Sequence, residues 1–262
     1  MKLNQKKLNL LQQIIKQAGD LILEVYNTDF SVDYKEDESP LTIADQKAND
    51  LIVKELDANF SGIHFITEET KDAPYSERKD WEYTWIIDPL DGTKEFVKRN
   101  GEFTVNIALC HEDEIVFGMV YVPVTGDTYY AQKDEGAFKI SATGEAIKLS
   151  AKKPDQDQLV VVASRSHRSQ EVDDFVEGMS DQFDSIEYRA AGSSLKLCLV
   201  AEGKAHIYPR LGPTMEWDTA AGHIVAIEAG ATITRHDNGK PLTYNKEDLL
   251  NPYFIVSSFS LN

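Results

Sequence analysis

The most constraining feature of this sequence is the stretch from Trp85 to Phe96, which reads Trp-Ile-Ile-Asp-Pro-Leu-Asp-Gly-Thr-Lys-Glu-Phe. The apolar, β-favouring residues 83–87 predict a buried strand that ends at Asp88. Pro89 excludes the helical conformation for Asp88 and is expected to stop the strand pairing. A carboxylate is therefore expected at the carboxyl end of a buried strand.

The residues that follow predict a tight turn at Asp91 and Gly92 and a short helix from Thr93 through Val97. Two carboxylates would then lie beside free backbone N–H groups of Gly92 and Thr93 at a helix N-terminus. Carboxylates bind hard divalent cations, and exposed amides at a helix N-terminus bind phosphate. Metal-assisted phosphate chemistry needs both. Asp-Pro and Asp-Gly pairs are also common in plain surface turns, so the motif alone leaves that alternative open.

Two stretches resemble a known family. Asp-Pro-Leu-Asp-Gly-Thr, residues 88–93, resembles the metal-binding signature of the inositol monophosphatase superfamily of lithium-sensitive, magnesium-dependent phosphatases. The Lys-Glu-Phe continuation at 94–96 is more similar to its 3'(2'),5'-bisphosphate nucleotidase branch than to its inositol branch. Residues 217–222, Trp-Asp-Thr-Ala-Ala-Gly, resemble the second signature of the superfamily. The resemblance spans residues 45–222 and implies an α+β/α/β fold, a layered αβαβα sandwich with two subdomains and mixed sheets.

The resemblance also implies a metal site and a catalytic group. Two or three Mg²⁺ ions would be held by the side chains of Glu68, Asp88, Asp91 and Asp218 and by the carbonyl oxygen of Leu90. Glu68 rather than Glu69 is the implied ligand, and it would also help to deprotonate the attacking water. Asp45 would orient Thr93, which contacts that water.

The residues themselves allow plainer explanations for three of these acids. Asp45 and Asp218 are each expected in the first turn of a helix, where any acid interacts favourably with the helix dipole. Glu68 and Glu69 follow a short strand predicted over 63–67, and adjacent acids on a loop are usually solvated. If that strand runs parallel to the next, however, Glu68 and Asp88 meet at one sheet edge, where ligands bind in open α/β sheets.

A second group of residues predicts phosphate and nucleotide binding. Gly-Ser-Ser-Leu-Lys at 192–196 offers backbone and hydroxyl donors at a helix start, and Arg210 adds a fork-shaped donor. A plain Ser N-cap also explains the two serines. These elements resemble the part of the bisphosphate nucleotidases where a 5'-phosphate and adenosine dock. The implied substrate-binding residues are Gly92, Thr93, His167, Gly192, Ser193, Ser194, Lys196, Tyr208, Arg210 and Asp218.

The rest of the chain predicts two subdomains. Apolar periodicity indicates helices over 4–27 and from about residue 42, with a polar loop at 36–39 between them. Period-two stretches over 104–110, 115–122, 128–131 and 137–140 predict an antiparallel meander. The polar segment around Pro154 predicts a boundary between an α+β subdomain, 1–153, and an α/β subdomain, 154–262. In the latter, strands are expected over 159–163, 185–188, 205–208, 232–234 and 254–257, and helices over 170–178, 193–202 and 216–229.

Composition limits the partners. A net charge of −17 over 262 residues argues against nucleic-acid polymers, which need a basic footprint, but allows a small phosphorylated ligand held through cations. Two cysteines in apolar segments suit a reducing compartment, and neither a signal peptide nor a membrane span is visible. A cytoplasmic monomer or homodimer is expected, with peripheral association at the inner face of the membrane left open.

Taken together, these features predict a Mg²⁺-dependent phosphatase that removes the 3'-phosphate of 3'-phosphoadenosine 5'-phosphate, with the sulfated analogue as a further substrate. The resemblance implies a place in sulfur metabolism and inhibition by Li⁺. An inositol or sugar monophosphate phosphatase shares the metal cluster but does not need Lys196 and Arg210. A non-catalytic nucleotide- or metal-binding module is the alternative outside enzymes.

Overall fold

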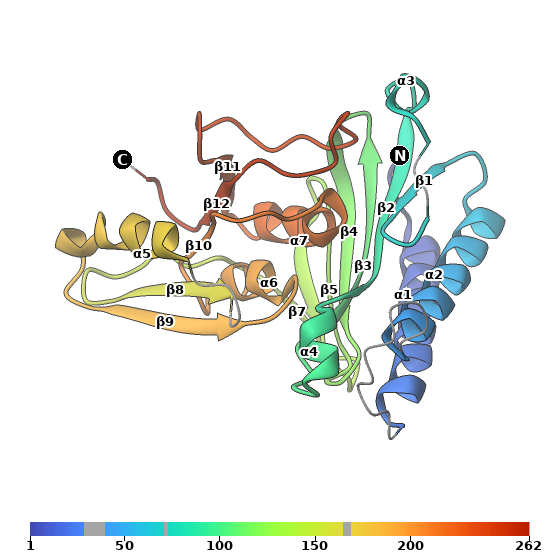
Figure 1. Ribbon diagram of the computed structural model, residues 1–262, viewed down its shortest axis with the longest axis horizontal. Coiled ribbons are helices and arrows are strands. Elements are labelled where there is room, and N and C mark those ends of the chain that lie inside the picture. The colour runs from blue at the N-terminus through green and yellow to red at the C-terminus, as the bar shows by residue number, and fades with distance from the viewer. Residues whose placement is uncertain (29–39, 71–72, 165–168, 262) are drawn as a thin grey trace.

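The computed structural model of the protein describes residues 1–28, 40–70, 73–164 and 169–261. Five layers succeed one another across the molecule (Figure 1): a helix pair, a seven-stranded sheet, a second helix pair, a five-stranded sheet and a last helix. Three hydrophobic clusters fill the spaces between these layers. The αβαβα sandwich implied by the resemblance is therefore confirmed. The loop predicted at 36–39 and His167 lie outside the described residues.

The first sheet has the strand order β1-β2-β3-β4-β5-β6-β7 and is parallel only between β1 and β2. The predicted meander is confirmed, and the short β7 extends it. The strands are β1 (His64–Thr67), β2 (Tyr83–Asp91), β3 (Thr104–His111), β4 (Glu114–Val122), β5 (Asp127–Gln132), β6 (Gly136–Ile140) and β7 (Ala146–Lys148). The helices of this half are α1 (Gln5–Tyr26), α2 (Pro40–Asn59), α3 (Tyr75–Arg78) and α4 (Thr93–Val97).

The second sheet has the order β11-β12-β10-β8-β9, with β8 parallel to both of its neighbours and β12 antiparallel to both of its own. Its strands are β8 (Leu159–Ser164), β9 (Ile186–Ala191), β10 (Ile207–Arg210), β11 (Thr232–Arg235) and β12 (Phe254–Ser257). The helices are α5 (Gln170–Glu177), the 3₁₀ turn η1 (Ser180–Gln182), α6 (Leu195–Ala201) and α7 (Glu216–Glu228). Both sheets are mixed, as expected.

Strand β2 is buried on both faces because helices cover both sides of the first sheet. Trp85 and Ile87 join the cluster under α1 and α2, whereas Ile86 joins the cluster shared with α6 and α7. A continuous apolar run is what such a strand requires, and the run before Asp88 has this character. None of the helices in the described ranges is both long enough and apolar enough to cross a membrane.

Four boundaries differ from the prediction. Strand pairing does not stop at Pro89: β2 forms a bulge and pairs again at Asp91, and bulges are where strands accept proline. Helix α2 begins at Pro40, since proline suits a first helical position, so Asp45 lies in its second turn rather than its first. The left-handed φ of 42° at Ser193 delays α6 to Leu195. Strand β10 runs two residues later than expected, because its pairing with β12 extends to Arg210.

Candidate active site

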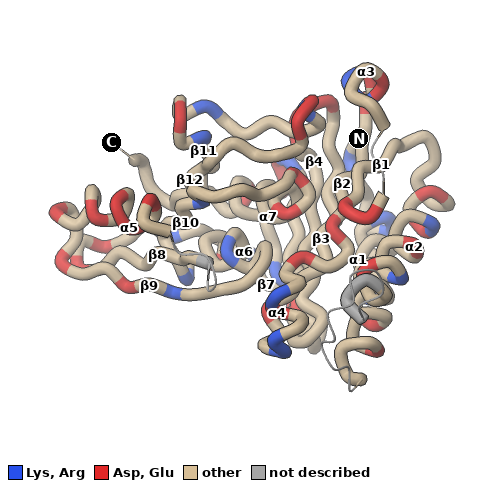
Figure 2. Tube along the Cα trace, in the orientation of Figure 1, with Lys and Arg blue, Asp and Glu red and all other residues tan. Residues whose placement is uncertain are grey.

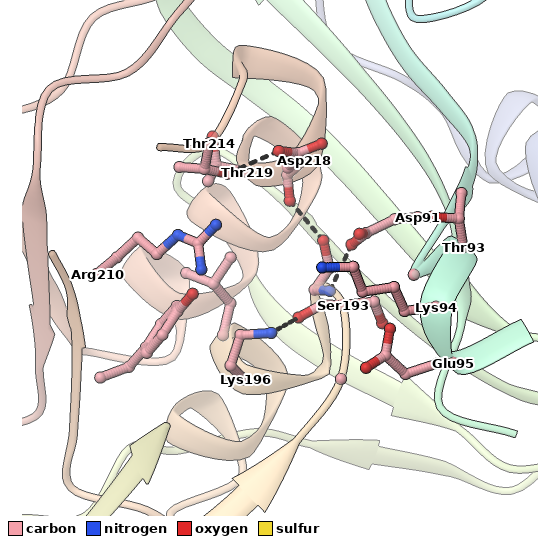
Figure 3. A pocket seen from close by; sticks show the side chains of 15 residues that line it. Asp91, Thr93, Lys94, Glu95, Ser193, Lys196, Arg210, Thr214, Asp218 and Thr219 are labelled. Carbon is pink, nitrogen blue, oxygen red and sulfur yellow. Dashed lines mark hydrogen bonds between the residues drawn. The ribbon is translucent and has the colours of Figure 1, made fainter. Parts of the chain in front are cut away.

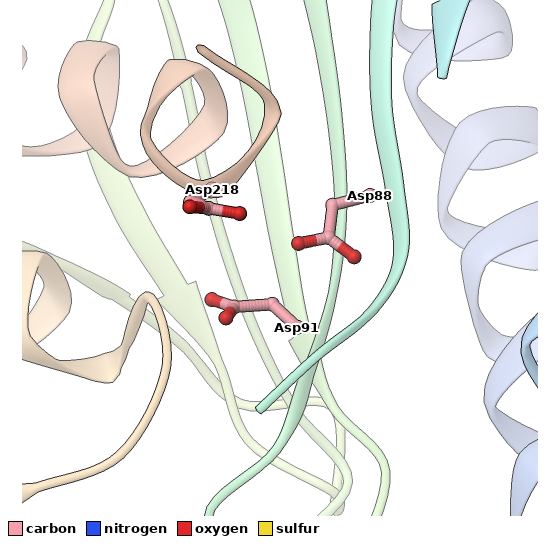
Figure 4. A group of neighbouring side chains, drawn as sticks. All are labelled: Asp88, Asp91 and Asp218. Atoms are coloured by element: carbon pink, nitrogen blue, oxygen red, sulfur yellow. The ribbon is translucent and has the colours of Figure 1, made fainter. Parts of the chain in front are cut away.

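Three aspartates lie close together between the end of β2 and the start of α7 (Figure 4). Asp88 and Asp91 come from the end of β2, and Asp218 comes from the first turn of α7. One carboxylate oxygen of each lies within 4.8 Å of those of the other two. Asp88 is buried and the other two are half-buried. Residues far apart in the sequence thus supply an all-oxygen donor set, which is the kind that hard divalent cations prefer.

Local backbone geometry orients the first two aspartates. The N–H of Leu90 donates to Oδ1 of Asp88 at 3.0 Å, within the bulge of β2. The other oxygen of Asp88, Oδ2, is buried and has no hydrogen-bond partner in the described part of the chain. Gly92 then turns the chain with a φ of 96°, a conformation that glycine adopts without strain. A buried carboxylate oxygen without a donor fits a place reserved for a cation.

Close helix packing brings Asp218 to the other two. A Cβ added to Gly118 of β4 would lie 2.4 Å from the carbonyl oxygen of Ala221, so α7 lies directly on the first sheet. A Cβ added to Gly222 would lie 2.7 Å from Leu197 of α6. The small residues of the Trp-Asp-Thr-Ala-Ala-Gly stretch therefore allow this close approach. Asp218 also caps its helix, accepting from the N–H of Met215 at 2.8 Å.

Glu68 stands at the edge of this group. It follows β1, which pairs in parallel with β2, so the expected meeting of the two strand ends is confirmed. Glu68 is exposed as a whole residue and is not among the three closest carboxylates. Its carboxyl group is nevertheless close enough to Asp218 and Asp91 for their charges to raise its pKa. Its position fits a ligand on the outer side of a cation cluster.

The clustering perturbs the protonation of these acids. Burial and repulsion from Asp218 raise the pKa of Asp91 to about 6. Desolvation of its carboxyl group and repulsion from Asp218 and Asp91 raise the pKa of Glu68 to about 7. Burial, followed by repulsion from Asp91 and Glu68, raises the pKa of Asp88 well above its ordinary value. Acids that resist ionisation together become anionic once a cation neutralises them, so the donor set fits a divalent metal.

Asp45 of α2 and Thr93 of α4 are the two further residues to which the resemblance assigns catalytic roles. Asp45 is buried, and the burial together with Glu69 and Glu68 raises its pKa to about 8. Its Oδ1 has no hydrogen-bond partner among the residues that the structure describes. Thr93 opens α4. The contact of Asp45 with Thr93 that the resemblance implies therefore stays a prediction.

A cavity of about 260 Å³ adjoins the aspartates (Figure 3). One wall is the segment 91–95, and the facing wall comes from α6, β10 and the start of α7. The cavity unites most of the predicted substrate-binding residues, namely Gly92, Thr93, Gly192, Ser193, Ser194, Lys196, Tyr208, Arg210 and Asp218. It also includes five residues that the sequence did not indicate: Lys94, Glu95, Leu197, Thr214 and Thr219.

The donors of the Gly-Ser-Ser segment are engaged within the protein. The N–H of Gly192 donates to Glu102 Oε2 at 2.9 Å, and the hydroxyl of Ser193 donates to the Glu102 carbonyl at 3.1 Å. Ser194 donates through its N–H to Asp91 Oδ2 and through its hydroxyl to the Asp218 carbonyl, both at 2.6 Å. Ser194 thus links the end of β2 to the first turn of α7. Phosphate binding by these three residues stays a prediction.

Asn106 is a site residue that the sequence analysis missed. It pairs with Asp88 across β2 and β3, and its amide donates to the hydroxyl of Ser194 at 3.0 Å. The sequence does indicate this residue, because Asn106 interrupts a mostly apolar strand and a buried amide there needs a polar partner. Glu102, in a loop, offered no such signal.

Lys196 and Arg210 place positive charge opposite the aspartates. Burial lowers the pKa of Lys196 to about 8, although Asp91 opposes the shift, and its ammonium donates to the Ser193 carbonyl at 2.6 Å. Arg210 donates to the carbonyl of Pro213, and its buried Nε has no partner within the described ranges. Figure 2 shows basic residues in and just after α4, and Lys94 of α4 also lines this cavity. The protein is acidic as a whole, yet this cavity can bind an anion.

Comparisons with known proteins agree with this geometry. The model of the Inositol monophosphatase family matches residues 3–258. The chain is 42% identical to 3'(2'),5'-bisphosphate nucleotidase CysQ of Salmonella typhimurium over 94% of this chain and 98% of that protein. It is equally identical to the Escherichia coli K12 protein of the same name, with the same coverage.

Solved structures give the same result. The crystal structure of CysQ from Bacteroides thetaiotaomicron has a TM-score of 0.87 and 42% identity, covering 96% of this chain and 98% of that one. Inositol monophosphatase II from Staphylococcus aureus, at 19% identity, has a TM-score of 0.77 over 95% of this chain and 88% of its own, which shows a shared fold. The chain therefore belongs to the inositol monophosphatase family, whose members are metal-dependent phosphatases.

Proposed function

We propose that this protein is a Mg²⁺-dependent 3'(2'),5'-bisphosphate nucleotidase. It would remove the 3'-phosphate of 3'-phosphoadenosine 5'-phosphate, giving AMP and phosphate, and act likewise on the sulfated analogue. The observation that carries the proposal is a single cavity lined both by Asp91 and Asp218 and by Lys196 and Arg210. A substrate with two phosphates needs the metal-binding carboxylates for one phosphate and the basic side chains for the other. The CysQ relatives at 42% identity, which are named as bisphosphate nucleotidases, support the same substrate class.

The residues that would hold two or three Mg²⁺ ions are those of the acid cluster. They are the carboxylates of Glu68, Asp88, Asp91 and Asp218 and the carbonyl oxygen of Leu90. Bound Mg²⁺ would neutralise phosphate oxygens and make a water more acidic. The raised pKa values and the unpartnered Oδ2 of Asp88 support this assignment, because both are relieved by a cation.

The remaining residues of the site would orient the water and the substrate. The hydroxyl of Thr93 would accept a hydrogen bond from the attacking water and donate to Asp45, whose buried Oδ1 lacks a donor. Glu68, at the exposed edge, would take the proton that the water loses. The N–H groups of Gly92 and Thr93 face the same cavity and would donate to the scissile phosphate. Such positioning is most of what phosphoryl transfer requires of a protein.

Recognition of the second phosphate would fall to Lys196 and Arg210. With a pKa of about 8, Lys196 carries its charge at neutral pH. Tyr208 lies beside it, with the ammonium 5.6 Å from the ring centroid. Gly192, Ser193, Ser194 and His167 would complete the nucleotide site. All the proposed metal ligands come from one chain, so a cytoplasmic monomer or homodimer would be active.

Phosphate release tests this function. The protein would be assayed with 3'-phosphoadenosine 5'-phosphate, adenosine 3'-phosphate and inositol 1-phosphate, each with Mg²⁺ and with EDTA. We expect Mg²⁺-dependent release and a preference for the bisphosphate. A preference for inositol 1-phosphate would replace the proposed substrate, and no release from any compound would point to a binding module.

A charge-removing variant links that preference to the cavity. Lys196→Met should raise KM for the bisphosphate by roughly 10–100-fold, since a charged hydrogen bond contributes about 1.5–3 kcal/mol. It should change KM for adenosine 3'-phosphate little, because that compound lacks the second phosphate. Lys204→Met removes an exposed lysine that pairs with Glu202 and serves as the control. Equal losses on both nucleotides would contradict the assigned role of Lys196.

A further inference from the structure

A buried carboxylate lies two residues before Asp218 in the sequence. Glu216 is fully buried at the start of α7. Its oxygens accept from the N–H of Asn245 at 2.6 Å, from the N–H of Lys246 at 3.1 Å and from the Lys246 ammonium. A buried carboxylate is tolerated only when it is paired and hydrogen-bonded in this way. The segment 245–246 therefore holds the first turn of α7 in one place.

The same segment is held from the other side by a buried arginine. Arg78, the last residue of α3, donates to Asn245 Oδ1 at 2.7 Å and to the Lys246 carbonyl at 3.1 Å. The amide of Asn245 donates back to the carbonyl of Arg78 at 2.8 Å. Arg78 belongs to the half of the chain that carries Asp88 and Asp91. A continuous buried chain of hydrogen bonds thus joins that half to the start of α7.

We propose that these four residues, Arg78, Asn245, Lys246 and Glu216, form a brace that sets the spacing of the metal-binding carboxylates. Arg78 and Glu216 are positioning residues in this proposal, because neither lines the cavity with the aspartates. The inference rests on the proposed function only in requiring that Asp88, Asp91 and Asp218 bind a divalent cation.

The position of Asp218 makes such a brace necessary. Its carboxylate approaches those of Asp88 and Asp91 within 4.8 Å, and like charges at that distance repel. The body of α7 meets Gly118 of the sheet through Ala221 and Ile224 and meets Leu197 of α6 at Gly222, and all of these contacts lie beyond the first turn that carries Asp218. The end of the helix that carries Asp218 is where repulsion acts, and the brace grips that end.

The chain offers a matched control at the opposite end of the same helix. Glu228 also accepts two backbone hydrogen bonds from a loop, from the N–H groups of Asp134 and Gly136, both at 2.9 Å. It lies ten residues beyond Asp218, or roughly 15 Å along the helix axis. Glu216→Gln and Glu228→Gln therefore each remove a carboxylate that accepts two backbone N–H bonds, near to and far from the aspartates, although only Glu216 also pairs with the Lys246 ammonium.

The test is direct binding of Mn²⁺ to the metal-free full-length protein, followed by electron paramagnetic resonance or calorimetry. Glu216→Gln should weaken Mn²⁺ binding by about 10-fold, as loss of supporting contacts around metal sites commonly does. Glu228→Gln should leave the Mn²⁺ affinity within about twofold of wild type, even if its melting temperature in EDTA falls as much as that of Glu216→Gln. Arg78→Lys keeps the charge but loses the paired donors of the guanidinium group, and it should also weaken Mn²⁺ binding. Because Arg78 lies in the other half of the chain, this variant provides the test if the Glu216 variant does not fold.

Turnover is measured separately so that the two proposals can fail independently. Suppose that the brace variants bind Mn²⁺ more weakly but that the wild-type protein hydrolyses none of the nucleotides. The brace would then be supported and the proposed nucleotidase activity would be refuted. Equal effects of Glu216→Gln and Glu228→Gln on Mn²⁺ binding, or no effect of the brace variants, would overturn the brace whatever the substrate.

Discussion

Replacing Asp91 with asparagine should produce a protein that is inactive yet more stable without metal. The wild-type carboxylate lies among other acids, and burial followed by repulsion from Asp218 raises its pKa from 3.8 to about 6. The folded protein therefore holds this proton more tightly than the unfolded chain does. As the pH rises from about 4 through 6, the metal-free wild type loses stability, because the carboxyl group of the folded protein resists ionisation.

The size of the effect follows from the shift. About two pKa units correspond to roughly 3 kcal/mol of destabilisation near pH 8. Asparagine removes the charge and can still accept from the Ser194 N–H, which lies 2.6 Å from the native Oδ2. Since a neutral acceptor forms the weaker bond, about 1 kcal/mol of the gain is lost. A net gain of roughly 1–2 kcal/mol should raise the melting temperature by about 3–6 °C in a chain of this size.

Thermal melts of both proteins in EDTA, near pH 8 and near pH 4, measure this gain directly. The Asp91→Asn variant should melt higher near pH 8, and the difference should vanish near pH 4, where the wild-type carboxyl is largely protonated. Adding Mg²⁺ should reverse the order, because only the wild type has the full ligand set. Turnover should fall by roughly three orders of magnitude, equivalent to about 4 kcal/mol of transition-state stabilisation. An active variant, or one no more stable than wild type near pH 8, would refute the reasoning.

Three further predictions concern the same site. Asp218→Asn should keep the helix cap and lose activity, whereas Asp218→Ala should also lose about 1 kcal/mol of stability with the cap, as denaturant melts would reveal. Gly118→Ala should cost about 1–3 kcal/mol because its Cβ would meet the Ala221 carbonyl oxygen at 2.4 Å, while Gly212→Ala, which meets nothing within 4 Å, should be nearly neutral in the same melts. Mg²⁺ affinity measured by calorimetry should rise about 10–100-fold between pH 5.5 and 8, as Glu68, with its pKa of about 7, and its neighbours ionise; an unchanged affinity would argue against carboxylate ligands.

Local sequence determined the elements that carry the chemistry. The apolar run into Asp88, the glycine turn and the helix opened by Thr93 depend on neighbours in the chain, and they appear as predicted except that β2 continues past Pro89 to Asp91. The same holds for Asp218 in the first turn of α7. Strand and helix periodicity, together with the family signatures, was sufficient for the layered fold.

Only the tertiary structure decided which groups each side chain meets. Phosphate binding by Ser194 stays a prediction, but its bonds to Asp91 and to the Asp218 carbonyl join distant parts of the chain and could not be read from its neighbours. Glu216 accepts from the N–H of Asn245, a residue that Arg78 holds from its other side, and nothing in the residues around Glu216 indicates either partner. Such partners lie tens of residues apart, and their pairing depends on strand register and helix packing, which no local pattern encodes. Local sequence does not encode the raised pKa values either, because the pKa of a carboxyl group depends on which acids the fold places beside it.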